Sequence, residues 1–279
     1  MRKLFIFCLL LLFTTSIRAQ ENLKLMTYNI RYDNPRDGEN RWDLRKDWLA
    51  NQVRFVGPDV MGIQEGLSHQ VAFLDENLTD YKYVGIGRDD GKTKGEYSAI
   101  FYNSNKLKLV DENTFWLSET PDKISVGWDA SMERICTYAL LEDKATKYQF
   151  YVFNAHFDHI GNLARANSVE LILKQIKTLN DKDLPVFLMG DLNLAPDSAP
   201  IKHLSSQMND AFQHSNNPTF GPIGTFNGFK HDRKVTRRID YIFTGTTKIE
   251  VNKYGVLSDS KDLKYPSDHL PVVIEVTIK

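Results

Sequence analysis

The sequence predicts an α/β layered fold built around a pair of mixed β-sheets. Seven short apolar runs have the length and composition of buried strands, and amphipathic helical patterns lie between some of them. Strands and helices do not alternate one by one, which disfavours a single parallel sheet of repeated βαβ units. With 42% apolar residues, a chain of this length can bury one large core as a single domain.

The predicted elements follow in chain order. The apolar runs that predict strands are Leu23–Ile30, Val60–Gln64, Ala99–Tyr102, Tyr148–Asn154, Pro185–Met189, Ile239–Phe243 and Pro271–Ile278. Helices are predicted at Trp42–Val56 and at Asn162–Leu179. The second helix places its apolar residues on one face at i+3 and i+4 spacing: Leu163, Ala166, Val169, Leu173, Ile176 and Leu179.

The first residues predict a secretory signal peptide, residues 1–19. Basic Arg2 and Lys3 precede the apolar run Leu4–Phe13, and Thr14–Ala19 leads to a cleavage site after Ala19. This apolar run is too short to span a bilayer, and no longer one follows. We therefore expect a secreted or periplasmic protein without a transmembrane segment, whose single catalytic domain covers residues 20–279.

Charge and cysteine content narrow the class of partner. The chain has 35 Lys and Arg against 36 Asp and Glu. Without Arg2, Lys3 and Arg18 the balance is 32 against 36, a net charge near −4. Because phosphate neutralisation supplies most of the affinity for nucleic acid, a mildly acidic chain makes long nucleic acid a less favoured partner than a small substrate. Only Cys136 remains after the leader, so no intramolecular disulfide is expected.

A carboxylate and a carboxamide follow one predicted strand directly. The run Pro185–Met189 ends at Gly190, and Asp191 and Asn193 come next. Residues i and i+2 of an extended segment point the same way, so both side chains would enter one site. A carboxylate beside an amide suits a metal-bound water and a phosphate oxygen. Taken alone, the pattern is equally typical of a turn that satisfies local backbone groups.

The same arrangement recurs at other predicted strand ends, and this repetition favours a functional site. The polar clusters lie at Asn29, Gln64–Glu65, His156–His159, Asp191–Asn193, Arg238–Asp240 and Ser267–His269. Any single one has an ordinary structural explanation, because a buried polar side chain needs partners. Six clusters of oxygen and imidazole ligands favour Mg²⁺, Mn²⁺ or Ca²⁺ over a structural zinc site.

In these six motifs and their order, the sequence resembles the endonuclease/exonuclease/phosphatase superfamily. The motifs are Tyr28-Asn29, Gln64-Glu65, His156, Gly190-Asp-Leu-Asn193, Arg238-Ile-Asp240-Tyr and Ser267-Asp268-His269. The superfamily includes deoxyribonucleases, abasic-site endonucleases, inositol polyphosphate 5-phosphatases, bacterial sphingomyelinases and poly(A) deadenylases. The resemblance implies a four-layer α/β/β/α sandwich, in which helices flank two mixed sheets.

The resemblance also implies a divalent-metal site and a water-activating group. Glu65 resembles the principal metal ligand, assisted by Asn29 and by Asp268, and Mg²⁺ (or Mn²⁺ or Ca²⁺) is the expected ion. Asp191 resembles the group that orients or deprotonates the attacking water. Asn193 resembles the residue that contacts a phosphate oxygen.

Two histidines complete the implied catalytic set. His269 resembles an acid/base group and phosphate contact, held in one tautomer by Asp240. His156 resembles the histidine that steadies the phosphate or the leaving oxygen. Glu96, which precedes a strand expected at Tyr97–Tyr102, resembles the carboxylate that pairs with it, although a solvated hairpin end gives the same pattern.

Loops rich in aromatic and polar residues are candidates for the substrate-binding wall. The candidates are Trp128, Phe226 and Phe229 for apolar contacts and Arg134, His159 and Arg165 for a phosphate or a polyol. For Trp128 a place in the core, and for Arg165 a solvated helix face, are the alternative interpretations.

The sequence thus predicts a secreted, monomeric, divalent-metal-dependent phosphoesterase. The expected substrate is a small phosphoester: a sugar, inositol, nucleotide or lipid-headgroup phosphate. An extracellular Mg²⁺- or Ca²⁺-dependent nuclease is the alternative. A non-catalytic binding module with the same fold is less favoured, because every matched catalytic position carries the expected residue type.

Overall fold

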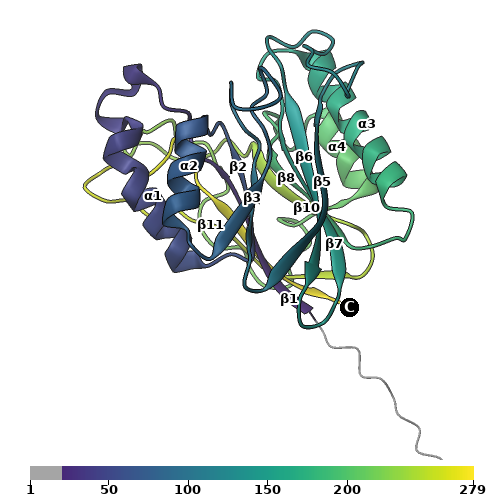
Figure 1. Ribbon diagram of the computed structural model, residues 1–279. Helices are drawn as coiled ribbons and strands as arrows, with labels where there is room; N and C mark the ends of the chain where they lie inside the picture. The colour runs from purple at the N-terminus through teal and green to yellow at the C-terminus, as the bar shows by residue number, and fades with distance from the viewer. Residues whose placement is uncertain (1–20) are drawn as a thin grey trace, which may run out of the picture.

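The computed structural model describes residues 21–279, which fold into four layers (Figure 1). Two six-stranded sheets pack face to face, and helices cover the outer face of each. The predicted fold class is confirmed. The predicted signal peptide, residues 1–19, lies outside the described residues. Between residues 21 and 279, no helix is both long and apolar enough to cross a membrane.

The first sheet has the strand order β11-β12-β1-β2-β4-β3. Its strands are β1 (Glu21–Asn29), β2 (Val60–Gln64), β3 (Tyr81–Val84), β4 (Ile100–Asn103), β11 (Ile249–Val256) and β12 (Val272–Ile278). Helices α1 (Trp42–Val56) and α2 (Ser68–Asn77) cover its outer face, and a 3-10 helix, η1 (Pro35–Asn40), precedes α1. β1 runs parallel to β2 and antiparallel to β12.

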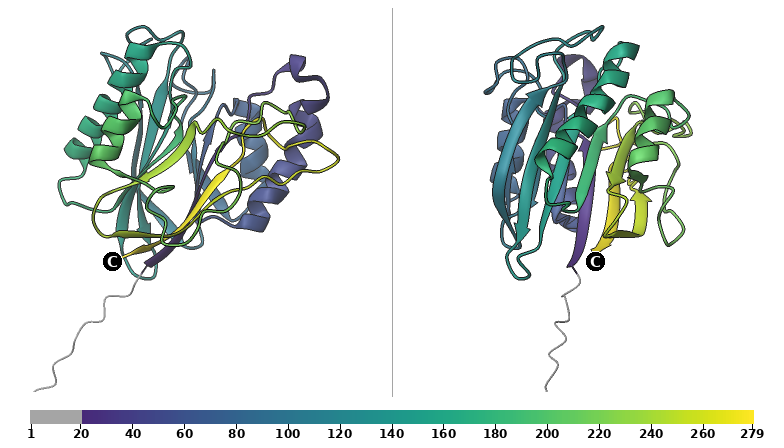
Figure 2. Two further views of the ribbon diagram at one scale, coloured as in Figure 1. Left: turned by 180° about the vertical axis from the view of Figure 1, so that it is seen from behind. Right: turned by 90° about the vertical axis from the view of Figure 1, so that its right-hand side faces the viewer.

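The second sheet has the order β5-β6-β7-β8-β10-β9. Its strands are β5 (Leu107–Trp116), β6 (Ile135–Asp143), β7 (Gln149–His156), β8 (Val186–Asp191), β9 (Asn209–Asp210) and β10 (Asp240–Thr244). Helices α3 (Asn162–Leu179) and α4 (Ala199–Gln207) cover the outer face, which Figure 2 shows from two further sides. β7 and β8 are parallel, and β10 is antiparallel to β8.

The apolar core has three parts because each sheet is buried on both faces. On β1, Leu25 packs between the two sheets, whereas Met26 and Tyr28 pack against α1 and α2. On β8, Met189 faces the other sheet and Leu188 faces α3 and α4. Strands buried on both faces read as continuous apolar runs rather than alternating ones. This explains why the central strands were predictable from sequence.

Strands at the sheet edges differ from this pattern. β5 is an edge strand with four consecutive exposed residues, Val110–Asn113, so it gives no apolar run, and β3, β9 and β11 likewise lie toward the edges. β6 also contains an apolar run, and nothing in the structure explains why it was not predicted as a strand. In α3 the predicted apolar face is displaced: Leu163 is 53% exposed, while Ala164, Val169 and Ile172 are buried.

One buried amide joins the two sheets. Asn154 on β7 donates from Nδ2 to the carbonyls of Ile63 (2.8 Å) and Ala99 (2.9 Å) in the first sheet. Its Oδ1 accepts from Gln64 Nε2 at 2.6 Å. Gly62 permits this approach, because a Cβ there would lie 2.7 Å from the Asn154 side chain. Three buried hydrogen bonds therefore fix the spacing of the sheets near one end of the sandwich.

Replacing Asn154 with leucine keeps the size of the side chain and removes these three hydrogen bonds. At about 1 kcal/mol for each bond, Asn154→Leu is expected to lower the free energy of unfolding by about 3 kcal/mol, measured by urea denaturation. Asn113→Leu, at an exposed position of β5, is the control, and its expected effect is within about 0.5 kcal/mol. If the two substitutions lowered the free energy of unfolding equally, Asn154 would not stabilise the contact between the sheets.

Candidate active site

The polar strand ends meet at one end of the sandwich. The carboxyl ends of parallel strands lie at the same edge, and antiparallel neighbours begin there. The residues brought to this edge are Asn29, Glu65, Glu96, Asp268 and His269 from the first sheet and Arg134, His156, Asp191 and Asp240 from the second. A cleft of about 840 Å³ opens between them. Within residues 21–279, all nine predicted catalytic and metal-site residues line this cleft or bond to residues that do.

An asparagine links two carboxylates across the sheets. Asn29 Nδ2 donates to Glu65 Oε1 and to Asp191 Oδ2, both at 3.0 Å. Asn29 Oδ1 instead accepts from the backbone N–H of Arg31 at 3.0 Å. The amide nitrogen therefore faces the carboxylates and holds them side by side. The predicted role of Asn29 as a direct metal ligand stays a prediction.

Arg31 lies between the two acidic residues of the first sheet. Its guanidinium is 3.8 Å from Glu65 Oε2 and 3.8 Å from Asp268 Oδ2. Two hydrogen bonds, of 2.9 and 3.0 Å, hold the same guanidinium on Asp37. Glu65 Oε2 also accepts from the backbone N–H of Tyr32 at 3.1 Å. Both acidic side chains are thus fixed in direction at the floor of the cleft.

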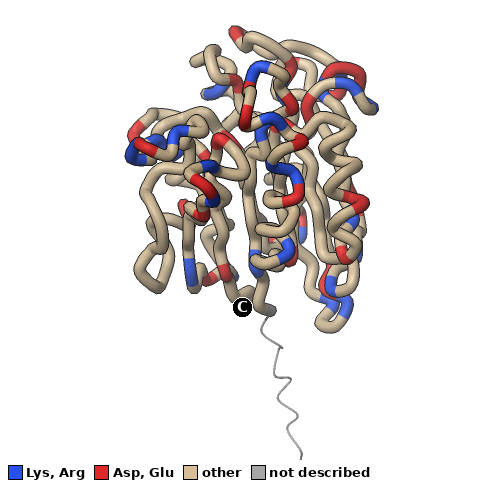
Figure 3. Tube along the Cα trace, turned by 90° about the vertical axis from the view of Figure 1, so that its left-hand side faces the viewer, with Lys and Arg blue, Asp and Glu red and all other residues tan. Residues whose placement is uncertain are grey.

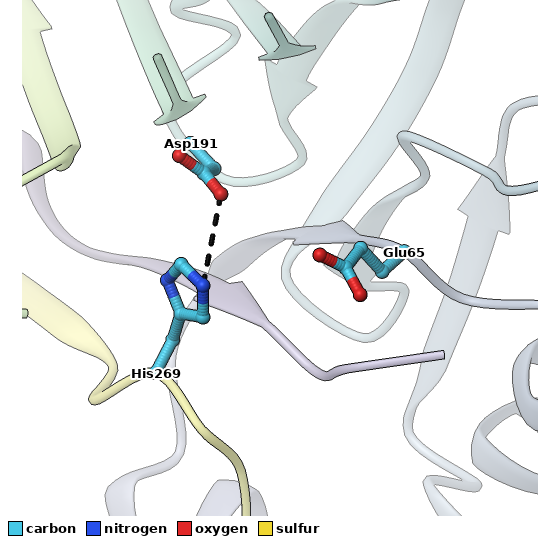
Figure 4. A group of neighbouring side chains, drawn as sticks. All are labelled: Glu65, Asp191 and His269. Atoms are coloured by element: carbon cyan, nitrogen blue, oxygen red, sulfur yellow. Dashed lines mark ion pairs between the residues drawn. The ribbon is translucent and has the colours of Figure 1, made fainter. Parts of the chain in front are cut away.

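The donor groups here fit a hard divalent cation. Glu65, Asp191 and His269 each present one ligand atom, and these atoms lie within 4.8 Å of one another. Figure 4 shows the three side chains converging from different elements. Burial raises the pKa of Asp268 to about 6 and of Asp191 to about 7, and the neighbouring carboxylates of Glu65 and Asp240 act in the same direction. The carboxylate oxygens suit Mg²⁺ or Mn²⁺, and the His269 imidazole could coordinate such an ion only through a deprotonated Nε2.

Asp191 and Asn193 share the site, as predicted from their spacing. Asp191 Oδ1 accepts from the backbone N–H of Asn193 at 3.0 Å. Burial, followed by the nearby Asp240 carboxylate, raises the Asp191 pKa. Asn193 has a left-handed backbone (φ 49°), and its Nδ2 donates to the carbonyl of Phe157 at 3.1 Å. An amide nitrogen carries two hydrogens, so the second one remains for a ligand in the cleft.

His269 is oriented by a carboxylate of the other sheet. Its Nδ1 lies 2.9 Å from Asp240 Oδ2, and its Nε2 faces Asp191 Oδ2 at 3.8 Å. Burial alone would lower the pKa of His269, but the Asp240 and Asp191 carboxylates outweigh it and raise the pKa to about 10. His269 is therefore a protonated donor at neutral pH.

His156 has the opposite electrostatic environment. Its Nε2 is 3.2 Å from Arg134 Nη1, and an arginine can only donate. The proton therefore lies on Nδ1, which faces Glu96 Oε2 at 3.6 Å. Burial, then the guanidinium groups of Arg134 and Arg88, hold the pKa of His156 well below its usual range. The two histidines thus differ in charge at neutral pH.

Two buried arginines support the His156 side of the cleft. Arg88 forms a two-bond pair with Glu96, at 2.8 and 3.1 Å. Arg134 donates from Nε to Asp158 Oδ1 at 3.2 Å and from Nη2 to His159 Nδ1 at 2.9 Å. Glu96 lies close to His156, as the resemblance implied. The strand expected at Tyr97 begins instead at Ile100.

Four of the six predicted substrate-wall residues line the cleft: Arg134, His159, Phe226 and Phe229. Trp128 and Arg165 do not, and for them the prediction is corrected. The backbone N–H of Trp128 donates to Glu119 in a loop outside the cleft. Arg165 turns along α3, where its guanidinium bonds to the carbonyl of Asp158 and to Asn162. A helical position close in sequence to the site therefore points away from it.

Several cleft residues had not been predicted: Arg31, Tyr32, Asp37, Arg88, Met132, Gly228, Arg237 and Ile239. Arg31 follows Asn29 by two residues and Arg237 precedes Asp240 by three. Their closeness in sequence to these two motifs was a sign that they could belong to the site. Arg88 belongs to a loop without a motif. Arg237 stacks on the Phe226 ring, with Cζ 4.8 Å from its centroid, and makes no ion pair with any described residue.

The positions of charged residues along the described trace, coloured in Figure 3, do not form a continuous basic track. Basic and acidic residues are interspersed along the trace there. Three of the four arginines of the cleft are neutralised by a carboxylate: Arg31 by Asp37, Arg88 by Glu96 and Arg134 by Asp158. This pattern differs from a groove that follows a nucleic-acid backbone.

Solved structures similar to this chain share its fold over nearly its whole length. An endonuclease/exonuclease/phosphatase family protein from Bacteroides thetaiotaomicron is 36% identical, with a TM-score of 0.89, over 94% of this chain and 99% of its own. A mannosyl-6-phosphatase from the same organism is 38% identical, with a TM-score of 0.87, over 91% of this chain and 99% of its own.

A curated relative comes from RNA metabolism. The CCR4-Not complex 3'-5'-exoribonuclease subunit Ccr4 of Mycosarcoma maydis is 22% identical over 94% of this chain, which spans 51% of that protein. The family model described as Endonuclease/Exonuclease/phosphatase family matches residues 26–269, a span that includes every motif from Asn29 to His269. The chain therefore belongs to the endonuclease/exonuclease/phosphatase family, whose members hydrolyse phosphoesters.

Proposed function

We propose that this protein is a divalent-metal-dependent hydrolase of a small phosphoester, such as a sugar, inositol, nucleotide or lipid-headgroup phosphate. The observation that carries the proposal is the pair of cross-sheet contacts, Asn29 to Asp191 and Asp240 to His269. These contacts hold the Asp191 carboxylate close to the His269 imidazole, which supports Asp191 as the group that activates water. The likeness to a mannosyl-6-phosphatase supports a small substrate.

In the attack of water on phosphorus, the residues of the cleft have different roles. Glu65 with Asp268 or Asp191 would hold a Mg²⁺, which would supply charge neutralisation at the phosphoryl oxygens. Asp191 orients the attacking water and accepts its proton, because its carboxylate is fixed by Asn29 and by the Asn193 backbone. His269 donates a hydrogen bond to the developing charge. Preorganised donors of this kind lower the barrier because they need no reorientation during the reaction.

His156 and its neighbours serve binding rather than proton transfer. The neutral ring of His156 and the buried guanidinium of Arg134 form one wall of the cleft. On the other side, Phe226 packs edge-on against His269 with ring centroids 5.0 Å apart, and Arg237 stacks on Phe226. We infer that this second side contacts the leaving group. An unpaired guanidinium on an aromatic ring suits the hydroxyls or charges of a sugar phosphate.

A phosphoester panel tests the proposed function. It should include sugar phosphates, inositol phosphates, nucleotides, sphingomyelin and plasmid DNA, each with Mg²⁺ and with EDTA. We expect metal-dependent hydrolysis of a small phosphoester and little nicking. Asp191→Asn and His269→Ala should each lower kcat by about 10²-fold or more, without changing the circular dichroism spectrum. Rapid plasmid nicking at low enzyme concentration would favour the nuclease alternative, and full activity of both variants would refute the site.

The pH profile tests the pairing of His269 with Asp240. A donor whose pKa is raised to about 10 acts below that pH and is lost above it. Asp240→Asn removes a carboxylate that raises this pKa, so the alkaline limb of kcat should move to lower pH by about one unit or more. Asp232→Asn, at an exposed position, is the control. An unmoved alkaline limb in Asp240→Asn would show that His269 is not the titrating donor.

Substitution of Arg237 tests the leaving-group side. Arg237→Gln removes the charge but leaves the catalytic residues in place, so KM for a sugar phosphate should rise about tenfold while kcat stays near the wild-type value. Arg233→Gln, on the same loop but outside the cleft, is the matched control. Steady-state kinetics with one sugar phosphate gives the KM and kcat of the wild type and of both variants. An unchanged KM in Arg237→Gln would remove this residue from the substrate site.

A further inference from the structure

Arg45 of α1 is a buried arginine whose partners are backbone carbonyls. Its side chain is 3% exposed. Nη1 donates to the carbonyls of Ile30 at 2.6 Å and Pro266 at 3.0 Å, and Nη2 donates to that of Arg31 at 2.7 Å. Nε donates to the carbonyl of Asn40 at 2.9 Å. No carboxylate of residues 21–279 forms an ion pair with it, so its hydrogen-bond partners are these four carbonyls.

Three of the four carbonyls, those of Ile30, Arg31 and Pro266, belong to the two segments that carry the acidic floor of the cleft, whereas Asn40 ends η1. Ile30 and Arg31 directly follow Asn29, which bonds to Glu65 and Asp191. Pro266 directly precedes the Ser267–His269 motif. Ser267 Oγ in turn donates to the carbonyl of Asn29 at 2.7 Å. Arg45 therefore bridges two chain segments more than 200 residues apart, on the side of the cleft that the carboxylates of Glu65 and Asp268 share.

The bridge also holds an unfavourable backbone conformation. Arg31 has φ of +56°, a left-handed conformation that a non-glycine residue adopts at a cost of about 1–3 kcal/mol. This turn directs the Arg31 N–H to Asn29 Oδ1 and the Tyr32 N–H to Glu65 Oε2. Arg45 bonds to the carbonyls of the two peptide groups that flank the Cα of Arg31, those of Ile30 and of Arg31 itself. The orientation of Asn29 and Glu65 thus depends on a turn that Arg45 braces.

We propose that Arg45 is a positioning residue for the divalent-metal site, an inference that rests on the proposed function. Through its planar fork it sets the distance between the segment that follows Asn29 and the segment that carries Asp268. A lysine cannot replace it, because one ammonium group cannot reach carbonyls in several directions as a guanidinium does. Aromatic contacts also hold the guanidinium in place, since Arg45 Cζ lies 5.1 Å from the centroid of the Trp42 ring and 5.7 Å from that of the Phe229 ring.

The test measures Mn²⁺ affinity by electron paramagnetic resonance at 10 °C, without substrate, for the wild type, Arg45→Lys and Arg45→Met. Supporting residues behind metal ligands typically contribute 10–100-fold in affinity, so both variants should bind Mn²⁺ at least about tenfold more weakly. Arg45→Lys keeps the positive charge but loses the planar guanidinium. A loss of Mn²⁺ affinity in this variant is therefore due to the missing hydrogen bonds and not to a change of charge. Arg41→Met is the control, an exposed arginine just before the same helix, and it should bind like the wild type.

Circular dichroism at the same temperature shows whether each variant is folded. Weakened Mn²⁺ binding by folded Arg45→Lys and Arg45→Met, with Arg41→Met unaffected, supports the proposal. Affinity within twofold of the wild type in either folded variant overturns it. Loss of folding in both variants at 10 °C also overturns it, because Arg45 would then determine the fold rather than the site. A wild-type protein that binds no Mn²⁺ would instead refute the metal site on which the proposed function depends.

Discussion

The structure depends on hydrogen bonds that cross from one sheet to the other. Asn154 joins the sheets in the buried interior, and Asn29–Asp191 and Asp240–His269 join them at the end where the cleft opens. Apolar packing holds two sheets at a roughly constant spacing but is not directional. Directional bonds between polar side chains fix how the sheets are registered. The positions of the proposed catalytic groups follow from that registration.

The central strands and the site motifs were predictable for related physical reasons. Strands such as β1 and β8 are buried on both faces, so they appear in the sequence as continuous apolar runs. Their last residues, Asn29 and Asp191, stand out because polar groups there interrupt such runs. The order of six motifs supplied the family resemblance, and with it the pairing of Asp240 with His269. Strand spacing alone does not give that pairing.

Other parts of the site follow from tertiary structure that local patterns do not encode. Arg88 and Arg134 reach the cleft from loops, and only the fold shows that they flank His156 and keep it neutral. Arg165 is close in sequence to His156, yet the direction of α3 turns it away from the cleft. Arg45 lies on a helix whose pattern predicts an ordinary amphipathic segment. A buried arginine that bonds to distant carbonyls has no local sequence signature. The predicted leader, residues 1–19, stays a prediction.

The placement of the site on two sheets has a consequence for partly folded states. Each sheet contributes only part of the proposed catalytic groups: Glu65 and His269 come from one, Asp191 and Asp240 from the other. The β1–β12 pairing also joins the two ends of the described chain, so the first sheet closes only after its last strand is made. A nascent or truncated chain that ends before Asp268 lacks both Asp268 and His269, so its proposed catalytic centre is incomplete. Enzymatic turnover would therefore report completed synthesis and assembly of the entire domain.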